Sequence, residues 1–149
     1  MYRTTDNDTI TVGELGVRFL VEAADSNGSA SVFECHVPAN SRMPAPHSHD
    51  GFEETIYGLE GITTWAIDDE TVEVGPGEAV CVRRGQIHGF RNHGDVDATF
   101  LAIATPGGFG PAYSREIGEV VAASAGGPPD LAAIGEVMRR HGLTPAPPS

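Results

Sequence analysis

Two histidines separated by a single residue, His47 and His49, are the side chains of this sequence best placed to do chemistry together. In an extended strand, residues two apart point to the same side, so both imidazoles can be aimed at one point. Glu54 breaks that alternation, so the backbone must turn or bulge near Asp50 and Gly51. Two imidazoles and one carboxylate form a donor set that suits a divalent transition metal.

A second stretch, residues 75–92, supplies a third histidine. It contains Gly77, Gly85 and His88, and the glycines are suited to the turns that separate two short strands. His88 is therefore the expected fourth ligand. Three neutral imidazoles and one carboxylate leave coordination positions open, whereas a closed structural zinc site is usually rich in cysteine. The sequence predicts one divalent metal ion with open coordination positions. It does not distinguish among Fe, Mn, Ni, Co, Cu and Zn.

The first stretch resembles the first motif of the cupin superfamily, which runs from a histidine pair through a glutamate to a glycine. The order in this chain is His47-x-His49-x4-Glu54-x6-Gly61. The spacing selects Glu54 over its neighbour, because only Glu54 leaves six residues before Gly61. Ser41 stands where the family motif begins with a glycine.

The second stretch resembles the second cupin motif. The order here is Gly77-x5-Arg83-x-Gly85-x2-His88-x3-Asn92. Arg83 stands where the family has a proline, which affects a turn and leaves the metal ligand in place. The resemblance covers roughly residues 17–105 and implies that all four family ligand positions are filled in this chain.

The resemblance implies an all-β fold, namely the double-stranded β-helix or jelly-roll-like barrel of the cupins. Small metal-binding cupins with this layout are similar to the quercetin 2,3-dioxygenase group. That similarity implies a metal-dependent dioxygenase acting on an aromatic or enolisable small molecule. Glu54 would then be both a ligand and the catalytic base that removes a proton from the substrate hydroxyl.

Two other classes of function stay open, because a fold does not determine a reaction. The same ion could act as a Lewis acid in a non-oxidative isomerase, lyase or hydrolase. The chain could also be a cupin that binds a small molecule without turnover. The predicted barrel brings few basic groups inward, which weighs against a sugar isomerase.

Phe90 and Ile56 are the candidate substrate-pocket residues. Phe90 shares a strand face with His88, and Ile56 shares one with Glu54, because side chains alternate along a strand. Both positions are equally consistent with plain barrel core. Trp65 could line a pocket or support a dimer, and parity alone does not decide between these roles.

Composition excludes several classes of function. The chain has 149 residues, a net charge of −12 and no lysine, so it lacks the basic surface of a nucleic-acid binder and the lysine of Schiff-base or P-loop chemistry. Arg83-Arg84 is more typical of a solvated turn than of an anion site.

Cys35 and Cys81 lie in predicted strands without redox or zinc spacing, which indicates two buried free thiols. Without a membrane-length apolar run or a signal-like start, we expect a cytoplasmic protein with no membrane partner.

Strand signals recur at roughly 8–12-residue spacing, which is typical of a β-barrel or sandwich. Helical periodicity begins only after residue 110, where Tyr113 and Ile117 share a face, and Asp130 and Gly142 bound a second helix. We therefore expect a barrel domain over residues 1–106 and a helical extension packed on it over 107–149, with a disordered proline-rich end from Pro145. Exposed edge strands favour a homodimer. The predicted strands cover residues 16–22, 29–37, 54–59, 62–67, 71–74, 79–83, 87–91 and 98–104.

Overall fold

The structure is a computed structural model that describes residues 1–4 and 7–148. Its described part is mostly β, with two helices near the C-terminus. The strands and helices, in chain order, are β1 (Ile10–Val12), β2 (Leu15–Val21), β3 (Ser31–Val37), β4 (His47–His49), β5 (Glu53–Glu60), β6 (Thr63–Ile67), β7 (Glu70–Val74), β8 (Ala79–Val82), β9 (His88–Arg91), β10 (Ala98–Thr105), α1 (Pro111–Ala123), α2 (Leu131–Arg140) and β11 (Leu143–Pro145).

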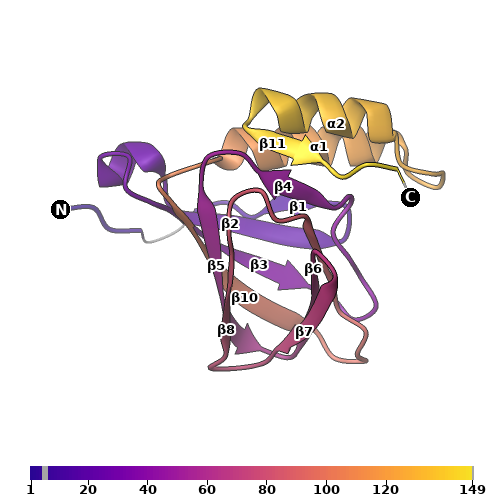
Figure 1. Cartoon of the computed structure of the whole chain (residues 1–149), viewed down its shortest axis with the longest axis horizontal. Helices are drawn as coiled ribbons and strands as arrows, with labels where there is room; N and C mark the ends of the chain where they lie inside the picture. Colours follow the sequence, from indigo (N-terminus) through magenta and orange to yellow (C-terminus); the bar gives the residue numbers. More distant parts are fainter. Residues whose placement is uncertain (5–6, 149) are drawn as a thin grey trace.

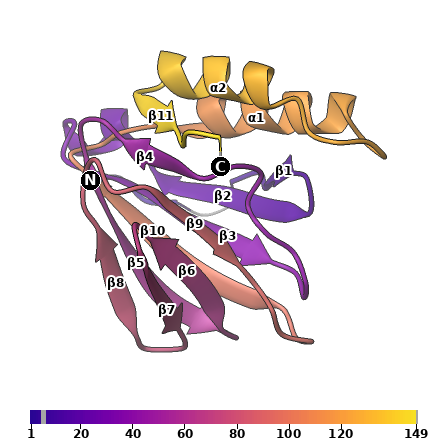
Figure 2. The same cartoon turned by 45° about the vertical axis from the view of Figure 1, so that its right-hand side comes forward.

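The described strands form two antiparallel sheets that face each other across the core (Figures 1 and 2). One sheet has the order β1-β2-β3-β10-β5-β8, and the other has the order β11-β4-β9-β6-β7. Strands adjacent in space are often distant in sequence, as β3 and β10 are, which is the arrangement of a jelly roll. The predicted double-stranded β-helix with two short C-terminal helices is confirmed.

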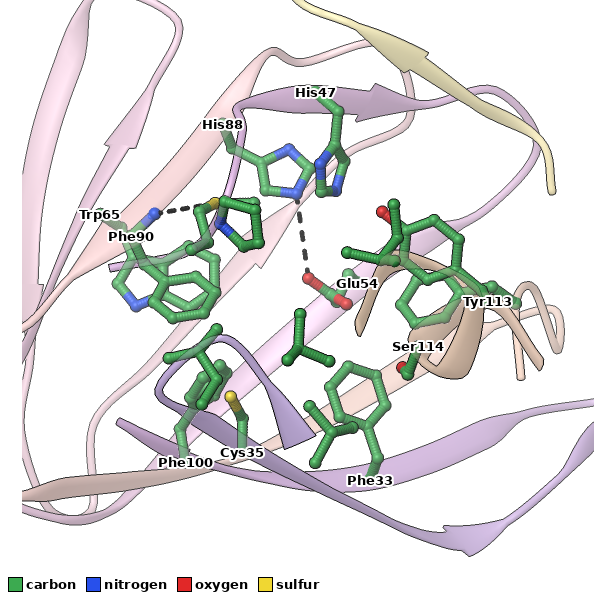
Figure 3. Close-up of a pocket in the computed structure, with 17 residues that line it drawn as sticks. Phe33, Cys35, His47, Glu54, Trp65, His88, Phe90, Phe100, Tyr113 and Ser114 are labelled. Carbon is green, nitrogen blue, oxygen red and sulfur yellow. Dashed lines mark hydrogen bonds and ion pairs between the residues drawn. The ribbon is translucent and has the colours of Figure 1, made fainter. Parts of the chain in front are cut away.

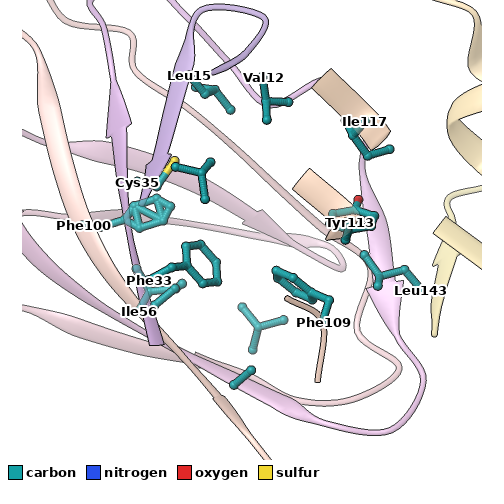
Figure 4. Close-up of a cluster of buried hydrophobic side chains, with 14 of the residues drawn as sticks. Val12, Leu15, Phe33, Cys35, Ile56, Phe100, Phe109, Tyr113, Ile117 and Leu143 are labelled. Atoms are coloured by element: carbon teal, nitrogen blue, oxygen red, sulfur yellow. The ribbon is translucent and has the colours of Figure 1, made fainter. Parts of the chain in front are cut away.

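The central strands alternate as a half-buried sheet requires. Along β10 every second side chain is buried, including Phe100 and Ala102. Their cross-strand partners on β3 are Cys35 and Phe33, so a large side chain faces a small one at each step. These pairs belong to the buried hydrophobic cluster between the two sheets, where Phe33, Cys35 and Phe100 lie close together (Figure 4).

The two helices lie across one end of the barrel, beside β1, β4 and β11 (Figures 1 and 2). Gly118 lets α1 approach the β1 backbone, because a Cβ there would overlap the carbonyl oxygen of Thr11. The start of α2 follows the sequence prediction, since the Asp130 carboxylate accepts a hydrogen bond from the Ala133 backbone N–H at 3.0 Å. None of the helices in the described chain is long and apolar enough to cross a membrane.

The prediction of a disordered end from Pro145 is wrong at its first residue, which lies in the last strand. Leu143–Pro145 form β11, which pairs with β4 and places Leu143 opposite His49 and Pro145 opposite His47. The segment is too short to show an alternating pattern, and its proline suggested a break, although proline is tolerated on an edge strand. β1 was missed for the same reason of length. The domain boundary at residue 106 and the homodimer stay predictions, because a single chain tests neither.

Candidate functional site

The second sheet brings His47, His49 and His88 together. β4 carries the first two, and His88 opens β9 directly opposite His47 in the antiparallel pairing. The ring centroid of His88 lies 4.8 Å from that of His47 and 4.5 Å from that of His49. One ring nitrogen from each histidine lies within 4.8 Å of the other two, and all three side chains are buried. Three imidazoles at this separation could hold one metal ion.

Backbone carbonyls hold two of the rings in one tautomer. Nδ1 of His47 donates to the carbonyl oxygen of Ala45 at 3.2 Å, and Nδ1 of His88 donates to that of Gln86 at 3.0 Å. A carbonyl oxygen only accepts, so each Nδ1 carries the hydrogen and each Nε2 keeps its lone pair. This is the outer-shell arrangement that orients metal-binding histidines.

His49 gives the observation that tests whether a metal fits. The ring is 1 % exposed, and neither of its nitrogens has a hydrogen-bond partner among the described residues. It stacks on Phe52 with ring centroids 4.3 Å apart, so packing fixes its orientation where hydrogen bonds do not. An unpaired buried polar group costs about 1–3 kcal/mol. A bound cation would remove part of that cost, so the donor set fits a metal ion.

Burial also keeps the three rings neutral. It is the main cause that lowers the pKa of His47 to about 3 and the pKa of His49 to about 2, and the charges of neighbouring histidines contribute in the same direction. The pKa of His88 is lowered by burial as well, although its hydrogen bond to Gln86 opposes the shift. Neutral imidazole is the form that binds metal, so the site is ready to accept a cation at neutral pH.

Glu54 lies beside the histidines but stands slightly apart from them. Its Oε1 is 3.9 Å from Nε2 of His88, and the side chain is buried (Figure 3). Burial raises the pKa of Glu54 to about 8 in the absence of a cation. A nearby positive ion would favour the ionised carboxylate instead. The structure therefore brings all four sequence-predicted ligands to one place, with Glu54 at the edge of the histidine cluster.

An apolar cavity of about 90 Å³ opens beside these groups. His47, Glu54 and His88 occupy one side of it (Figure 3). The volume is of the same order as the ~150 Å³ engineered cavity that binds benzene. The cavity therefore matches a single ring or a short carbonyl chain. Its aromatic lining consists of Phe33, Trp65, Phe90, Phe100, Phe109 and Tyr113.

The two predicted pocket residues lie in different places. Phe90 lines the cavity, but Ile56 is fully buried in the core and does not line it. Ile56 and Glu54 do share the inner face of β5. The alternation of side chains along the strand therefore predicted the correct face of the sheet, but it could not predict whether the side chain reaches the cavity. Trp65 also lines the cavity, and its Nε1–H donates to Thr63 Oγ1 at 2.9 Å.

Comparison with known proteins agrees with this geometry. The cupin domain family matches residues 33–104. The polyketide cyclase RemF from Streptomyces resistomycificus is 33% identical, covering 70% of this chain and 79% of that chain, with a TM-score of 0.62. This chain belongs to the cupin family.

Two more distant cupin relatives were found. Quercetin 2,3-dioxygenase from Bacillus subtilis is 25% identical over 76% of this chain. The chain spans only 33% of that curated relative's length. A predicted oxalate decarboxylase from Thermotoga maritima is 22% identical, covering 71% of this chain and 99% of that chain, with a TM-score of 0.63. The latter shows the shared fold alone.

Three cavity residues of this cupin come from α1, outside the matched residues 33–104. Tyr113, Ser114 and Ile117 are buried and line the cavity (Figure 3). The sequence analysis placed Tyr113 and Ile117 on one helical face but assigned neither a functional role, and it did not consider Ser114. Periodicity indicated that this face is covered, and it could not show that it covers the metal-site cavity.

The remaining candidates are the arginine pair and the two cysteines. Arg84 forms a two-point ion pair with Glu53, with Nε 2.6 Å from Oε2, and this arginine is the main cause that lowers the pKa of Glu53 to about 2. The arginine pair thus belongs to an exposed turn. Cys35 is buried in the cavity wall, but Cys81 is exposed, which contradicts its predicted burial. Cys81 faces outward because β8 is an edge strand on which it pairs with the outward Thr55.

Proposed function

We propose that this cupin is a metal-dependent enzyme that removes a proton from an enolisable or phenolic small molecule. The observation that carries the proposal is the position of Glu54. Its buried carboxyl group lies 3.9 Å from the nearest histidine nitrogen and also borders the aromatic-lined cavity. A base in that position can reach a substrate whose oxygen is directed toward the histidines.

Each residue of the site has a separate role in this proposal. His47, His49 and His88 would hold one divalent transition metal ion, with Glu54 as a fourth ligand or as a base beside it. When bound, the ion supplies positive charge that polarises a substrate oxygen and makes the adjacent proton more acidic. Glu54 accepts that proton. The apolar walls exclude water, which strengthens the electrostatic interactions inside the cavity.

Ring closure without oxidation is the outcome best supported by the comparisons, because the relative with the higher identity is a polyketide cyclase. Polyketide chains contain carbon atoms between two carbonyl groups, and the protons on those carbons are acidic. Glu54 would take one such proton, the resulting carbanion would attack another carbonyl carbon of the same chain, and a carbon–carbon bond would form. The proton on Glu54 would then pass to the new alkoxide oxygen.

Dioxygenation is the second candidate, and it is supported by the similarity to quercetin 2,3-dioxygenase. Here Glu54 would remove a proton from a phenolic or enolic hydroxyl, and molecular oxygen would react with the electron-rich carbon skeleton. Both oxygen atoms would enter the product as a ring or chain carbon–carbon bond breaks. The cavity of about 90 Å³ favours short triketone chains for ring closure, and catechols or short 1,3-diketones over a complete flavonol for dioxygenation.

The experiment compares zinc-loaded protein with iron-, manganese- and nickel-loaded protein on a panel of 1,3,5-triketones, 1,3-diketones, catechols and flavonols. Product mass and oxygen consumption are measured together. Product formation without oxygen uptake, also with redox-inert zinc, is expected for ring closure. Oxygen uptake that matches product formation would favour dioxygenation. Saturable binding without any product would contradict an enzymatic role and support a binding module.

A further inference from the structure

The cavity has a second polar side, which comes from a helix, whereas the histidine cluster comes from strands. α1 presents Tyr113 and Ser114 to the same cavity that Glu54 borders (Figure 3). These residues are 8 % and 5 % exposed, so both side chains are largely buried. α1 lies beyond residues 33–104, which match the cupin domain family, so the motifs of that match do not include this side.

Neither hydroxyl is used by the protein itself. Within residues 1–4 and 7–148, no hydrogen bond is formed by the Tyr113 hydroxyl or by the Ser114 hydroxyl. Among the other polar groups of the cavity, Trp65 donates to Thr63 and two histidines donate to carbonyls, whereas Oε1 of Glu54 lies 3.9 Å from Nε2 of His88, beyond hydrogen-bond distance. Buried hydroxyls are usually hydrogen-bonded. Two adjacent hydroxyls without a protein partner that line one cavity are free to bind a polar atom that a ligand supplies.

Packing holds these hydroxyls in place. The Tyr113 ring lies between Phe109, with centroids 5.1 Å apart, and His141, with centroids 5.5 Å apart. One turn along α1, Glu116 accepts a hydrogen bond from Arg140 of α2 at 2.8 Å. The close approach at Gly118 fixes the helix against β1. The two donors are therefore positioned before a ligand arrives, which is what selective binding requires.

Tyr113 is suited to act as a donor. Burial, and secondarily the charge of Glu54, raise the pKa of the Tyr113 hydroxyl, so it stays protonated at neutral pH. A neutral hydroxyl can donate to a carbonyl, enolate or phenolic oxygen. The rest of the cavity between α1 and the histidines is apolar and aromatic, so it offers no competing donor to a ligand lying flat within it.

We propose that Tyr113 and Ser114 bind a second oxygen of the ligand and so restrict the site to molecules with oxygen functions at two ends of a flat apolar body. One oxygen would face His47, His49 and His88, and the other would face α1. This inference rests on the proposed function for the first oxygen and adds the substrate class. Both residues are specificity determinants, and neither is placed in the proton-transfer step.

The test measures dissociation constants of matched ring compounds on zinc-loaded protein, where no redox reaction can occur. Hydroquinone is compared with 4-methylphenol, and resorcinol with 3-methylphenol, because each pair differs only in a hydroxyl replaced by a methyl group. The wild-type protein is expected to bind at least one of the two diols about tenfold more tightly than its methyl partner, as one buried hydrogen bond would give. Tyr113→Phe combined with Ser114→Ala should abolish that preference and leave the affinity for the methylphenols unchanged.

Tyr57→Phe is the matched control, because Tyr57 is exposed on the outer face of β5 and should not alter any affinity. A wild-type protein without preference for either diol would overturn the proposal, and so would a preference that survives in the double variant. The wild-type comparison needs no variant, so a folding defect could not hide the answer. Failure here would leave proton removal by Glu54 standing, whereas loss of that activity would not change the binding preference.

Discussion

The cavity has two walls that differ in how their polar groups are held. The strand wall consists of His47, Glu54 and His88, together with His49, which belongs to the same histidine cluster but does not line the cavity. The helix wall consists of Tyr113, Ser114 and Ile117. Two strand-wall histidines, His47 and His88, are fixed by hydrogen bonds to backbone carbonyls two residues earlier in the chain. The helix-wall hydroxyls are fixed only by the packing of α1. In the proposals made above, the strand wall supplies the chemistry and the helix wall selects the ligand.

The largest effect should follow from removing one imidazole of the strand wall. His49→Ala should lower metal affinity by more than about 100-fold and abolish turnover, because changes to residues that merely support ligands already cost 10–100-fold. Metal content after dialysis would measure this. His36→Ala is the control, since His36 is exposed and pairs with Asp97 at 3.2 Å. Equal metal content in His49→Ala and wild type would contradict the assignment of the strand wall.

Glu54→Gln should separate proton transfer from metal binding. The amide keeps the shape and an oxygen donor but loses most of its proton affinity, so turnover should fall by about 10²–10⁴-fold while part of the metal is retained. Turnover per bound ion is the quantity to measure. Glu53→Gln, which alters the neighbouring exposed carboxylate, should leave it unchanged. If Glu54→Gln turned over as fast as wild type per ion, Glu54 would be a ligand only.

The pH dependence of stability tests the strand wall without metal. Unfolded histidines bind protons below their ordinary pKa of 6.5, whereas folding lowers the pKa of His47 to about 3. Stability should therefore be lost as the pH falls below about 6.5. Glu54 acts in the opposite sense, because its folded pKa of about 8 exceeds the unfolded value of 4.5, so stability falls as the pH rises toward 8. Urea unfolding midpoints measured between about pH 5 and 8 with a chelator present should show both the loss of stability at acid pH and the loss toward pH 8.

Glu54→Gln should remove the loss of stability above about pH 6.5 and leave the acid limb in place. A metal-loaded sample should behave differently, because a bound cation favours the ionised carboxylate. A flat profile for the metal-free wild type would show that the histidines and Glu54 are more accessible to water than the structure indicates.

The smallest effect is expected on the helix wall. Gly118→Ala places a methyl group against the Thr11 carbonyl, so it should destabilise the protein by about 1–3 kcal/mol, as overpacking typically does. Metal affinity should not change, because α1 carries none of the predicted ligands. Gly135→Ala in α2 is the control, since it has room for a Cβ and should be neutral or stabilising. Equal unfolding midpoints for both variants would mean that α1 is not held tightly against β1.

The sequence predicted the strand wall better than the helix wall for a physical reason. Two histidines two residues apart must share a strand face, and the motif spacing then identified Glu54 and His88 as their neighbours. Local periodicity also found α1 and α2. It could not predict where α1 docks, because Gly118 meets Thr11 across more than a hundred residues of chain. For a related reason, the sequence could not show that Ile56 lies in the core and not at the cavity. The alternation along β5 shows which face of the sheet the side chain is on, but not how deep it lies.

The central claim, that the strand wall holds one metal ion, is tested most directly by anomalous diffraction from crystals loaded with one equivalent of zinc or cobalt. The account predicts a single peak about 2.0–2.2 Å from one nitrogen each of His47, His49 and His88, next to the Glu54 carboxylate. A peak bound elsewhere on the chain, or no peak among these three rings in the loaded crystal, would contradict it.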